Sequence, residues 1–526
     1  MEQDLTTSVY TFEDLIQGNF LYVDKTEYIW QLVRPTKGMY FLSRPRRFGK
    51  SLLLSTLEAI FEGKKALFKG LAIDGKPYEW EPYPVIHIDF SNSNLETAKD
   101  VREFLQDELD ELSRALGIPR RGRSLGKQFE YLIQDAANSS VKKKVVILVD
   151  EYDKPILSNI SNPLQCQRIL KVLKGFYSNI KRGEKFTRLA FVTGVSKFCH
   201  VSLFSELNNL TDLTLDVGYA AMLGFTEAEV RHYYAERIAV AAKDKRISTD
   251  ELMKRLLVWY DGYRFSKADI HVCNPVSIST FFEKNHEFDN YWGTTGEPTV
   301  LFELAKTTRF NFERALAAPV SSQAFGAYDI ENIDPLGLLW QTGYLTIKDV
   351  LPGPMDSSMY RLGFPDYEVE QSFNTQLLAY YSGYKDAAMS SIVFSLTTAI
   401  QGDDVELFMR TLQAYFASIP YDIRGKDEYY YQTIFFITFL LLGCVIDAES
   451  RTSEGRIDAY IRTAKSIYIF EFKLNKGAKR AVSQIVDRHY YEKFQSASLP
   501  IRMIGVNFDS SKGRIEGWKK MTLHNQ

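Results

Sequence analysis

Two groups of residues in this 526-residue chain have the types and spacing that chemistry at phosphate groups requires. The first is the sequence Arg-Pro-Arg-Arg-Phe-Gly-Lys-Ser, which ends at Ser51 between an apolar run and a helical pattern of leucines. A strand, a loop and a helix N-terminus in this order turn backbone N–H groups towards a phosphate. Lys50 would reach the β- and γ-phosphate oxygens, and the Ser51 hydroxyl would help to hold Mg²⁺. We therefore expect ATP to bind at Arg46, Arg47, Phe48, Gly49, Lys50 and Ser51.

One position of this loop departs from the pattern G-x-x-x-x-G-K-[ST]. Arg44 stands where that pattern has its first glycine. A large side chain there could alter access to the phosphates, because glycine is the residue that lets a backbone approach a ligand closely. The alternative interpretation is a basic turn between a strand and a helix, with no nucleotide.

Acidic residues after a second apolar strand favour the nucleotide site. The strand expected at 145–149 ends in Asp150, which could hold a metal ion through water, and Glu151, which could activate an attacking water. A further strand, expected at 188–193, leads to Ser196 and Lys197. The carboxyl ends of strands face the ligand in nucleotide-binding sheets, so Ser196 could sense the γ-phosphate. A hydrogen-bonded turn without ligand contact is the alternative there.

The second group of acids lies near the C-terminus. Strands are expected at 455–461 and 466–474, joined by a short polar turn. Side chains alternate along a strand, so Glu471 and Lys473 share one face. Asp458 and Glu471 would bind Mg²⁺ beside a scissile phosphate, and Lys473 would orient the attacking water or stabilise the developing charge. A solvated strand edge is the ordinary alternative for one carboxylate and one lysine.

Two helices could add to this second site. A helix expected at 478–494 carries Gln484 on the same face as Ala481 and Ile485, so Gln484 could reach the pocket. A helix that begins near 427 carries Glu428, a further acid.

The elements that must position these residues alternate in a way typical of α/β proteins. One additional strand, at 84–90, is expected between the phosphate-loop strand and the acidic strand, followed by a polar helical region from 95 to about 137. From Thr226 the pattern becomes helical, and aromatic residues at 259–265 and 291–296 are expected to pack rather than to stack on bases. Two strands expected at 338–347 and 360–365 would resemble a winged helix, and we favour packing over DNA binding for it.

Composition sets broad limits on function. The formal charge of −2 and a pI near 6.4 give no global attraction to nucleic acid, so such binding would need local basic patches. Four widely spaced cysteines without a C-x-x-C pair argue against a zinc site or a disulfide framework and favour a reducing cytoplasm. The first residues lack a signal-peptide pattern, and the apolar run 434–446 is too short to span a bilayer, so we expect no membrane partner.

Both groups of residues resemble known families. The phosphate loop, the Val-Asp-Glu-Tyr-Asp sequence that ends at Asp153, and Phe-Val-Thr-Gly-Val-Ser-Lys, which ends at Lys197, resemble the AAA-ATPase-like proteins of bacteria that carry a C-terminal nuclease-type domain. The distal set resembles the PD-(D/E)XK nuclease superfamily, with Ile457 where the pattern has proline. The resemblance spans roughly 421–507 in that part and implies the residues Glu428, Asp458, Glu471, Lys473 and Gln484.

These observations predict an α/β protein with a P-loop ATPase sheet at 1–225, a helical lid and winged-helix-like module at 226–375, and a PD-(D/E)XK-type α/β domain at 376–526. The first hypothesis is an ATPase coupled to a Mg²⁺-dependent nuclease that acts on nucleic acid, with DNA preferred and homo-oligomerisation left open. The second is a nucleotide-switched DNA- or protein-binding module with a catalytically inactive nuclease-like domain.

Overall fold

The computed structural model describes residues 3–91, 95–197, 209–293, 298–326, 333–383, 386–419, 428–442, 450–452 and 455–523. The chain forms two compact units. The first consists of Met1–Gly296 and Ala318–Val369, and the second of Glu297–Ala317 and Glu370–Gln526. The first unit therefore takes in the expected ATPase part and most of the expected middle module.

The first unit is built on a parallel sheet with the strand order β2-β3-β4-β1-β5. Because β1 pairs with β4, and β4 with β3, the ends of the phosphate-loop strand and the acidic strand lie on either side of the end of β4. All three candidate segments thus leave the same edge of the sheet. The strands are β1 (Gly38–Ser43), β2 (Val85–Asp89), β3 (Val145–Asp150), β4 (Thr187–Gly194) and β5 (Thr211–Asp212).

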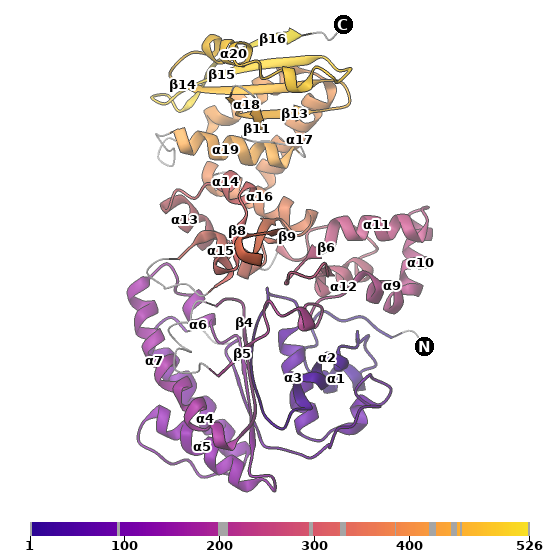
Figure 1. Cartoon of the computed structure of the whole chain (residues 1–526), viewed down its shortest axis with the longest axis vertical. Coiled ribbons are helices and arrows are strands. Elements are labelled where there is room, and N and C mark those ends of the chain that lie inside the picture. The colour runs from indigo at the N-terminus through magenta and orange to yellow at the C-terminus, as the bar shows by residue number, and fades with distance from the viewer. Residues whose placement is uncertain are drawn as a thin grey trace. The chain divides into compact units, whose positions relative to one another are not determined.

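Helices cover both faces of this sheet, as Figure 1 shows for α4, α5 and α7 on one side and α1, α2 and α3 on the other. The polar region expected as helical from 95 to 137 forms two helices, each begun by a side-chain cap from Thr97 or Ser124. The helices are α1 (Phe12–Gln17), α2 (Thr26–Val33), α3 (Lys50–Phe61), α4 (Ala98–Ala115), α5 (Leu125–Ser139), α6 (Lys154–Leu157) and α7 (Pro163–Arg182).

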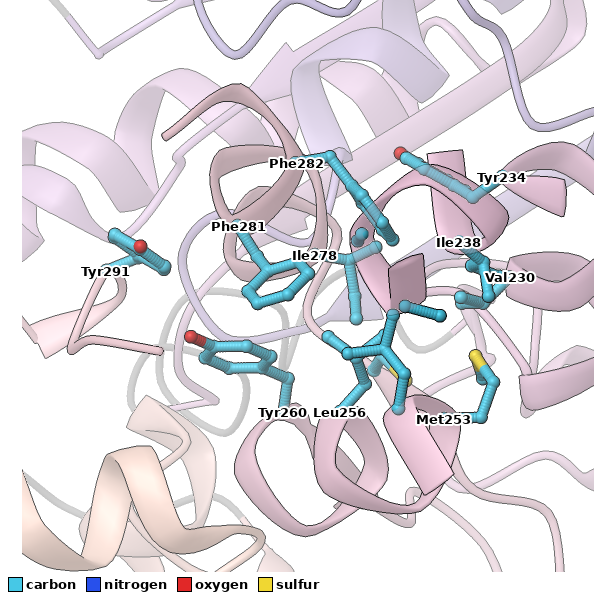
Figure 2. Close-up of a cluster of buried hydrophobic side chains, with 14 of the residues drawn as sticks. Val230, Tyr234, Ile238, Met253, Leu256, Tyr260, Ile278, Phe281, Phe282 and Tyr291 are labelled. Carbon is cyan, nitrogen blue, oxygen red and sulfur yellow. The ribbon is translucent and has the colours of Figure 1, made fainter. Parts of the chain in front are cut away.

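A helical subregion follows the sheet in the same unit. The expected helix from 226 begins with a capping box between Thr226 and Glu229 but is interrupted at Tyr234. The aromatic residues Tyr260 and Tyr291 pack with Phe281 in its core, as Figure 2 shows, which confirms that the segments at 259–265 and 291–296 contribute packed rings. The elements are α9 (Glu227–Tyr233), α10 (Ala235–Asp244), α11 (Thr249–Tyr260), α12 (Pro275–Glu283), and the paired strands β6 (Asp261–Tyr263) and β7 (Val272–Cys273).

An ion pair between buried Lys25 and half-buried Glu229 joins the beginning of the chain to this helical subregion. The Lys25 Nζ atom lies 2.6 Å from Glu229 Oε1 and also donates to the carbonyl of Ala221. Beside it, the Asp24 carboxylate accepts hydrogen bonds from Thr26 and from the backbone of Ala72. This segment therefore stabilises the start of α2 and the start of α9 together.

The predicted strand at 338–347 is wrong in its first half. Residues Pro335–Thr342 form helix α15, which begins at the capping side chain of Asp334 and ends at Gly343, whose φ of 91° stops the helix. The following hairpin, β9 (Thr346–Pro352) and β10 (Ser358–Gly363), pairs through β10 with β8 (Val320–Ser321). A helix followed by a hairpin agrees with the expected winged-helix-like arrangement.

The second unit contains a four-stranded sheet in the order β13-β14-β15-β16, in which only β14 and β15 are parallel. Helix α20 packs on this sheet through Ile485, together with Ile467 and Ile469 of β14. The elements are α13 (Thr299–Thr307), α14 (Phe312–Ala317), α16 (Tyr367–Ser382), α17 (Asp386–Gly402), α18 (Val405–Ser418), α19 (Glu428–Leu441), β11 (Ser450–Thr452), β12 (Gly455–Ile457), β13 (Ala459–Arg462), β14 (Ile467–Leu474), α20 (Ala478–Asp487), β15 (Ile501–Asp509) and β16 (Arg514–Leu523).

Two expectations for this unit need correction. The single strand expected at 455–461 is divided at Asp458, so that β12 pairs with β11 while β13 pairs with β14. The helix expected at 478–494 ends at Asp487, because the chain leaves helical geometry at Arg488 and His489 has a φ of 48°. Across the described parts of both units, no helix combines the length and the apolar character needed to cross a membrane.

Candidate nucleotide and nuclease sites

The phosphate loop has the open shape that an anion requires. Arg47 and Gly49 adopt positive φ angles of 65° and 87°, the left-handed geometry found in backbone concavities that bind anions. Among the described residues, a Cβ atom built on Gly49 would meet no other atom within 4 Å, so none of them fills the space above the loop. No side chain caps the N-terminus of α3, which begins at Lys50. The loop therefore fits a phosphate group.

Lys50 lies at the point where the two nucleotide motifs meet. Its side chain is buried, and the Nζ atom donates to the carbonyls of Arg44 at 3.1 Å and Pro45 at 3.0 Å. Burial lowers the pKa of Lys50, while the charges of Glu151 and Asp150 oppose this change. The positive charge of Lys50, from the first motif, therefore interacts with the negative charges of Asp150 and Glu151, from the second.

Arg44 does not occupy the space above the loop. Its buried guanidinium group donates to the carbonyls of Ser43 and Thr214 at 2.9 Å each, and lies 4.2 Å from the ring centre of Phe265. Burial lowers its pKa to about 9. The arginine that replaces the usual glycine therefore points into the protein interior, away from where phosphates would bind.

The acids after β3 fit a hydrated magnesium ion. Asp150 is buried, and burial raises its pKa, whereas a hydrogen bond from Ser51 and the charge of Lys50 lower it. A serine hydroxyl beside a carboxylate offers the hard oxygen ligands that Mg²⁺ prefers. Glu151 follows with a φ of 48°, a left-handed conformation that is uncommon for a non-glycine residue and occurs preferentially at functional sites.

Ser196 has a partner that the sequence did not suggest. Its hydroxyl and backbone N–H both donate to Asp153 Oδ2 at 2.6 Å, and the side chain is fully buried. Sequence analysis missed Asp153 as a structural residue, although its position three residues after Asp150 was visible. Gly194 provides a second signal, since a Cβ there would lie 2.6 Å from the Tyr152 ring. A contact of Ser196 with the γ-phosphate stays a prediction.

Lys197, the residue after Ser196, connects the end of β4 to helix α15. Its backbone N–H donates to Gln341 Oε1 of α15 at 2.9 Å, and its Nζ atom pairs with Asp212 at 2.7 Å. The end of β4 is therefore bonded on one side to the acidic loop and on the other to α15.

In the second unit, Asp458 and Glu471 lie close together. Asp458 occupies the break between β12 and β13, where its Oδ2 atom accepts the backbone N–H of Phe472 at 2.8 Å. Glu471 on β14 is buried, and burial together with the negative charge of Asp458 raises its pKa to about 7. Two carboxylates that repel one another in a buried position form a site that a divalent cation would stabilise.

Lys473 lies in the same place, as the alternation along β14 predicts. Its Nζ atom donates to Glu471 Oε1 at 2.7 Å. The Glu471 Oε2 atom is buried, and no donor in the described part of the chain reaches it. This acceptor is therefore available to a metal ion, and the residues present fit Mg²⁺.

The structure describes the other two predicted residues of this site, Gln484 and Glu428, in less detail. Gln484 lies half-buried on α20, whose neighbouring Ala481 and Ile485 face the sheet. Glu428 begins α19, but its side chain lies outside the described residues. Within those described residues, no group of three or more Asp, Glu, His or Cys side chains gathers around one point, so the observed carboxylate set is the pair Asp458 and Glu471.

Two residues that sequence analysis missed bring α20 close to this pair. Gly505 pairs with Glu471 across the sheet, and a Cβ at this position would lie 2.7 Å from the backbone of Val482 on α20. Asn507 is buried and its Oδ1 atom accepts the N–H groups of Lys476 and Gly477, just before the helix. A glycine inside an otherwise apolar strand is the sequence signal for such a close approach.

Comparison with known proteins identifies two regions of the chain. Residues 6–204 match the model of a family described as predicted AAA-ATPase, and residues 426–518 match that of the PD-(D/E)XK nuclease superfamily. The chain is 35% identical over 524 residues to an uncharacterized protein in the vnfD 5' region of Azotobacter chroococcum mcd 1, with 98% of each chain covered. The chain therefore belongs to the family of AAA-ATPase-like proteins that carry a C-terminal PD-(D/E)XK nuclease superfamily domain.

Proposed function

We propose that this protein is an ATPase coupled to a Mg²⁺-dependent nuclease that hydrolyses phosphodiester bonds of nucleic acid, with DNA as the preferred substrate. The observation that carries the nuclease part is the proximity of half-buried Asp458 to buried Glu471, which accepts a hydrogen bond from Lys473. For the ATPase part it is the mutual electrostatic effect of Lys50 and the acids after β3.

In the first unit, Lys50 would hold the β- and γ-phosphates against the N–H groups at the start of α3. Ser51 and Asp150 would hold the magnesium ion, which supplies charge neutralisation for the transferred phosphoryl group. Glu151 would accept a proton from the attacking water. Its backbone N–H donates to Asp150 Oδ1 at 2.9 Å, an arrangement that fixes the base next to the metal ligand.

In the second unit, Asp458 and the free Oε2 atom of Glu471 would hold the metal ion, which lowers the pKa of a bound water and stabilises charge on the phosphate. Lys473, anchored to Glu471 Oε1, would orient the attacking water or stabilise the developing charge. Gln484 and Glu428 remain proposed contributors from α20 and α19.

We further propose that ATP binding licenses cleavage, so that nuclease activity depends on the state of the first unit. The test is cleavage of single- and double-stranded DNA and RNA with Mg²⁺ or Mn²⁺, in the presence and absence of ATP. We expect cleavage by the wild type that is lost in Lys473→Ala and becomes independent of ATP, or disappears, in Lys50→Ala. Equal cleavage by the wild type and Lys473→Ala would reject the nuclease assignment.

ATP turnover is measured separately with Glu151→Gln. This variant keeps a side chain of similar size but lacks the proposed base, so it should bind ATP while its turnover falls by about 100-fold or more. A wild type that binds ATP without hydrolysing it would instead support a nucleotide-switched binding module.

A further inference from the structure

Phe48, the residue before Gly49 in the phosphate loop, contacts residues that do not belong to the parallel sheet. Its side chain is buried and contacts two rings of the segment at β6, with centroid distances of 4.7 Å to Tyr263 and 5.4 Å to Phe265. Both contacts are edge-to-face, the arrangement that aromatic pairs favour. The loop is therefore fixed through one of its own side chains by a segment more than 200 residues later in the sequence.

Arg44 anchors the other end of the loop on the same ring. Its guanidinium carbon lies 4.2 Å from the centre of Phe265, and the group is buried. A cation placed over a ring face away from water is attracted more strongly than one at an exposed site. Phe265 thus contacts the first and the fifth residue of the stretch Arg44-Pro-Arg-Arg-Phe48.

The segment that carries Phe265 is itself fixed. Thr346 Oγ1 accepts the backbone N–H of Arg264 at 2.7 Å and donates to the Arg264 carbonyl at 3.1 Å. The Arg264 side chain donates to the carbonyls of Ser266 and Ala268. Because these bonds hold the backbone on both sides of the ring, Phe265 is a rigid support rather than a mobile side chain.

Two further contacts join the loop to the same part of the unit. Trp292 Nε1 donates to the Arg46 carbonyl at 3.3 Å. A Cβ built on Gly343 would lie 2.6 Å from Pro45, so the end of α15 approaches the loop as closely as glycine permits. Arg44, Pro45, Arg46 and Phe48 therefore each contact at least one of the residues Tyr263, Phe265, Trp292 and Gly343.

We propose that Phe265 is a positioning residue for the phosphate loop, which acts on the nucleotide through Arg44 and Phe48 and does not touch it. In loops with glycine at the first position, that residue's small size lets the backbone curve around the phosphates. In this protein Arg44 replaces that glycine, and the contacts of the Phe265 ring with Arg44 and Phe48 fix the curve of the loop backbone instead. This inference rests on the proposed binding of ATP and assigns the element that shapes the site.

The test replaces the ring while keeping an apolar side chain of similar length. Phe265→Met removes the ring face and edge, and a flexible methionine fills much of the volume. Phe281→Met is the matched control, because Phe281 is equally buried in the same unit but packs among Tyr260, Phe282 and Phe288, away from the loop. Full-length proteins are compared for binding of Mg²⁺-ATP by calorimetry, for kcat and KM of ATP hydrolysis, and for the thermal midpoint.

We expect Phe265→Met to weaken Mg²⁺-ATP binding roughly tenfold, and Phe281→Met to change it less than about twofold at a comparable midpoint. Phe48→Met should reproduce the loss of affinity from the loop side, and it keeps the test decisive if Phe265→Met does not fold. Equal affinities for the two matched variants, or an unchanged affinity in Phe48→Met, would overturn the positioning role alone. A wild type that does not bind Mg²⁺-ATP would overturn the proposed ATPase as well.

Discussion

Replacement of Glu471 by glutamine should stabilise the metal-free second unit at high pH while it removes nuclease activity. Burial and the charge of Asp458 raise the Glu471 pKa from 4.5 to about 7. Between these values the folded protein binds a proton that the unfolded chain has released, so the stability contributed by Glu471 falls as the pH rises through this window. The difference corresponds to about 3 kcal/mol lost at pH 8 relative to pH 4.

Glutamine has no charge to bury, and its Oε1 atom can still accept the hydrogen bond that Lys473 gives to Glu471. In the presence of EDTA at pH 8, Glu471→Gln should therefore raise the thermal midpoint of the second unit by about 5 °C or more. At pH 5 the two proteins should unfold at nearly the same temperature, because Glu471 is then protonated. Glu492→Gln changes an exposed acid of the same unit and should have little effect at either pH.

The measurement is differential scanning calorimetry at pH 5 and pH 8, with and without Mg²⁺. Magnesium should raise the wild-type midpoint at pH 8, because it neutralises the two carboxylates that carry no proton at this pH, and should leave Glu471→Gln unchanged. If Glu471→Gln lowers the midpoint by the same amount at both pH values, the carboxylate is not strained by its neighbours and the reasoning is refuted.

Three further predictions concern the first unit. Ser196→Ala should lower the unfolding free energy by about 1–2 kcal/mol, measured by urea denaturation, because Asp153 loses a hydrogen-bond donor; ATP affinity measured in parallel tests the predicted contact with the γ-phosphate, which weaker binding would support and unchanged binding would contradict. Lys25→Met should cost about 2 kcal/mol in the same assay by leaving the half-buried Glu229 without its ion-pair partner, and Lys25→Met combined with Glu229→Leu should recover part of this loss; identical single and double variants would exclude the ion pair as the cause. Gly49→Ala should cost about 1 kcal/mol through its positive φ and should weaken ATP binding measured by calorimetry, since the added methyl group enters open space over the loop; unchanged binding would place the phosphates elsewhere.

The relative positions of the candidate residues were easier to predict than the boundaries of the elements that carry them. Lys50, Asp150, Glu471 and Lys473 lie where the motifs place them, because local alternation and the common edge of a parallel sheet constrain a side chain within a few residues. The first half of the strand expected at 338–347 is helical instead. A short apolar run has no clear period, and Asp334 and Gly343, which decide its structure, lie outside it.

Long-range contacts could not be predicted from one sequence. The sequence shows that Arg44 replaces the first glycine of the loop pattern, but the contact of Arg44 with Phe265 joins residues far apart in the chain. The aromatic segment at 259–265 was expected to pack, and the structure shows which residues it packs against. Asp153 and Gly505 were missed for the same reason, since each is explained by a neighbour from another strand or helix.

The contact between the end of β4 and α15 has one more consequence. Its donor is the backbone N–H of Lys197, so exchanging the side chain at 197 leaves the contact in place unless proline is introduced. Gln341, whose amide also donates to the Gly326 carbonyl, is therefore the side chain whose substitution would remove this bond. The acidic loop and α15 are thus joined through two consecutive backbone N–H groups, those of Ser196 and Lys197, with no exposed side chain between them.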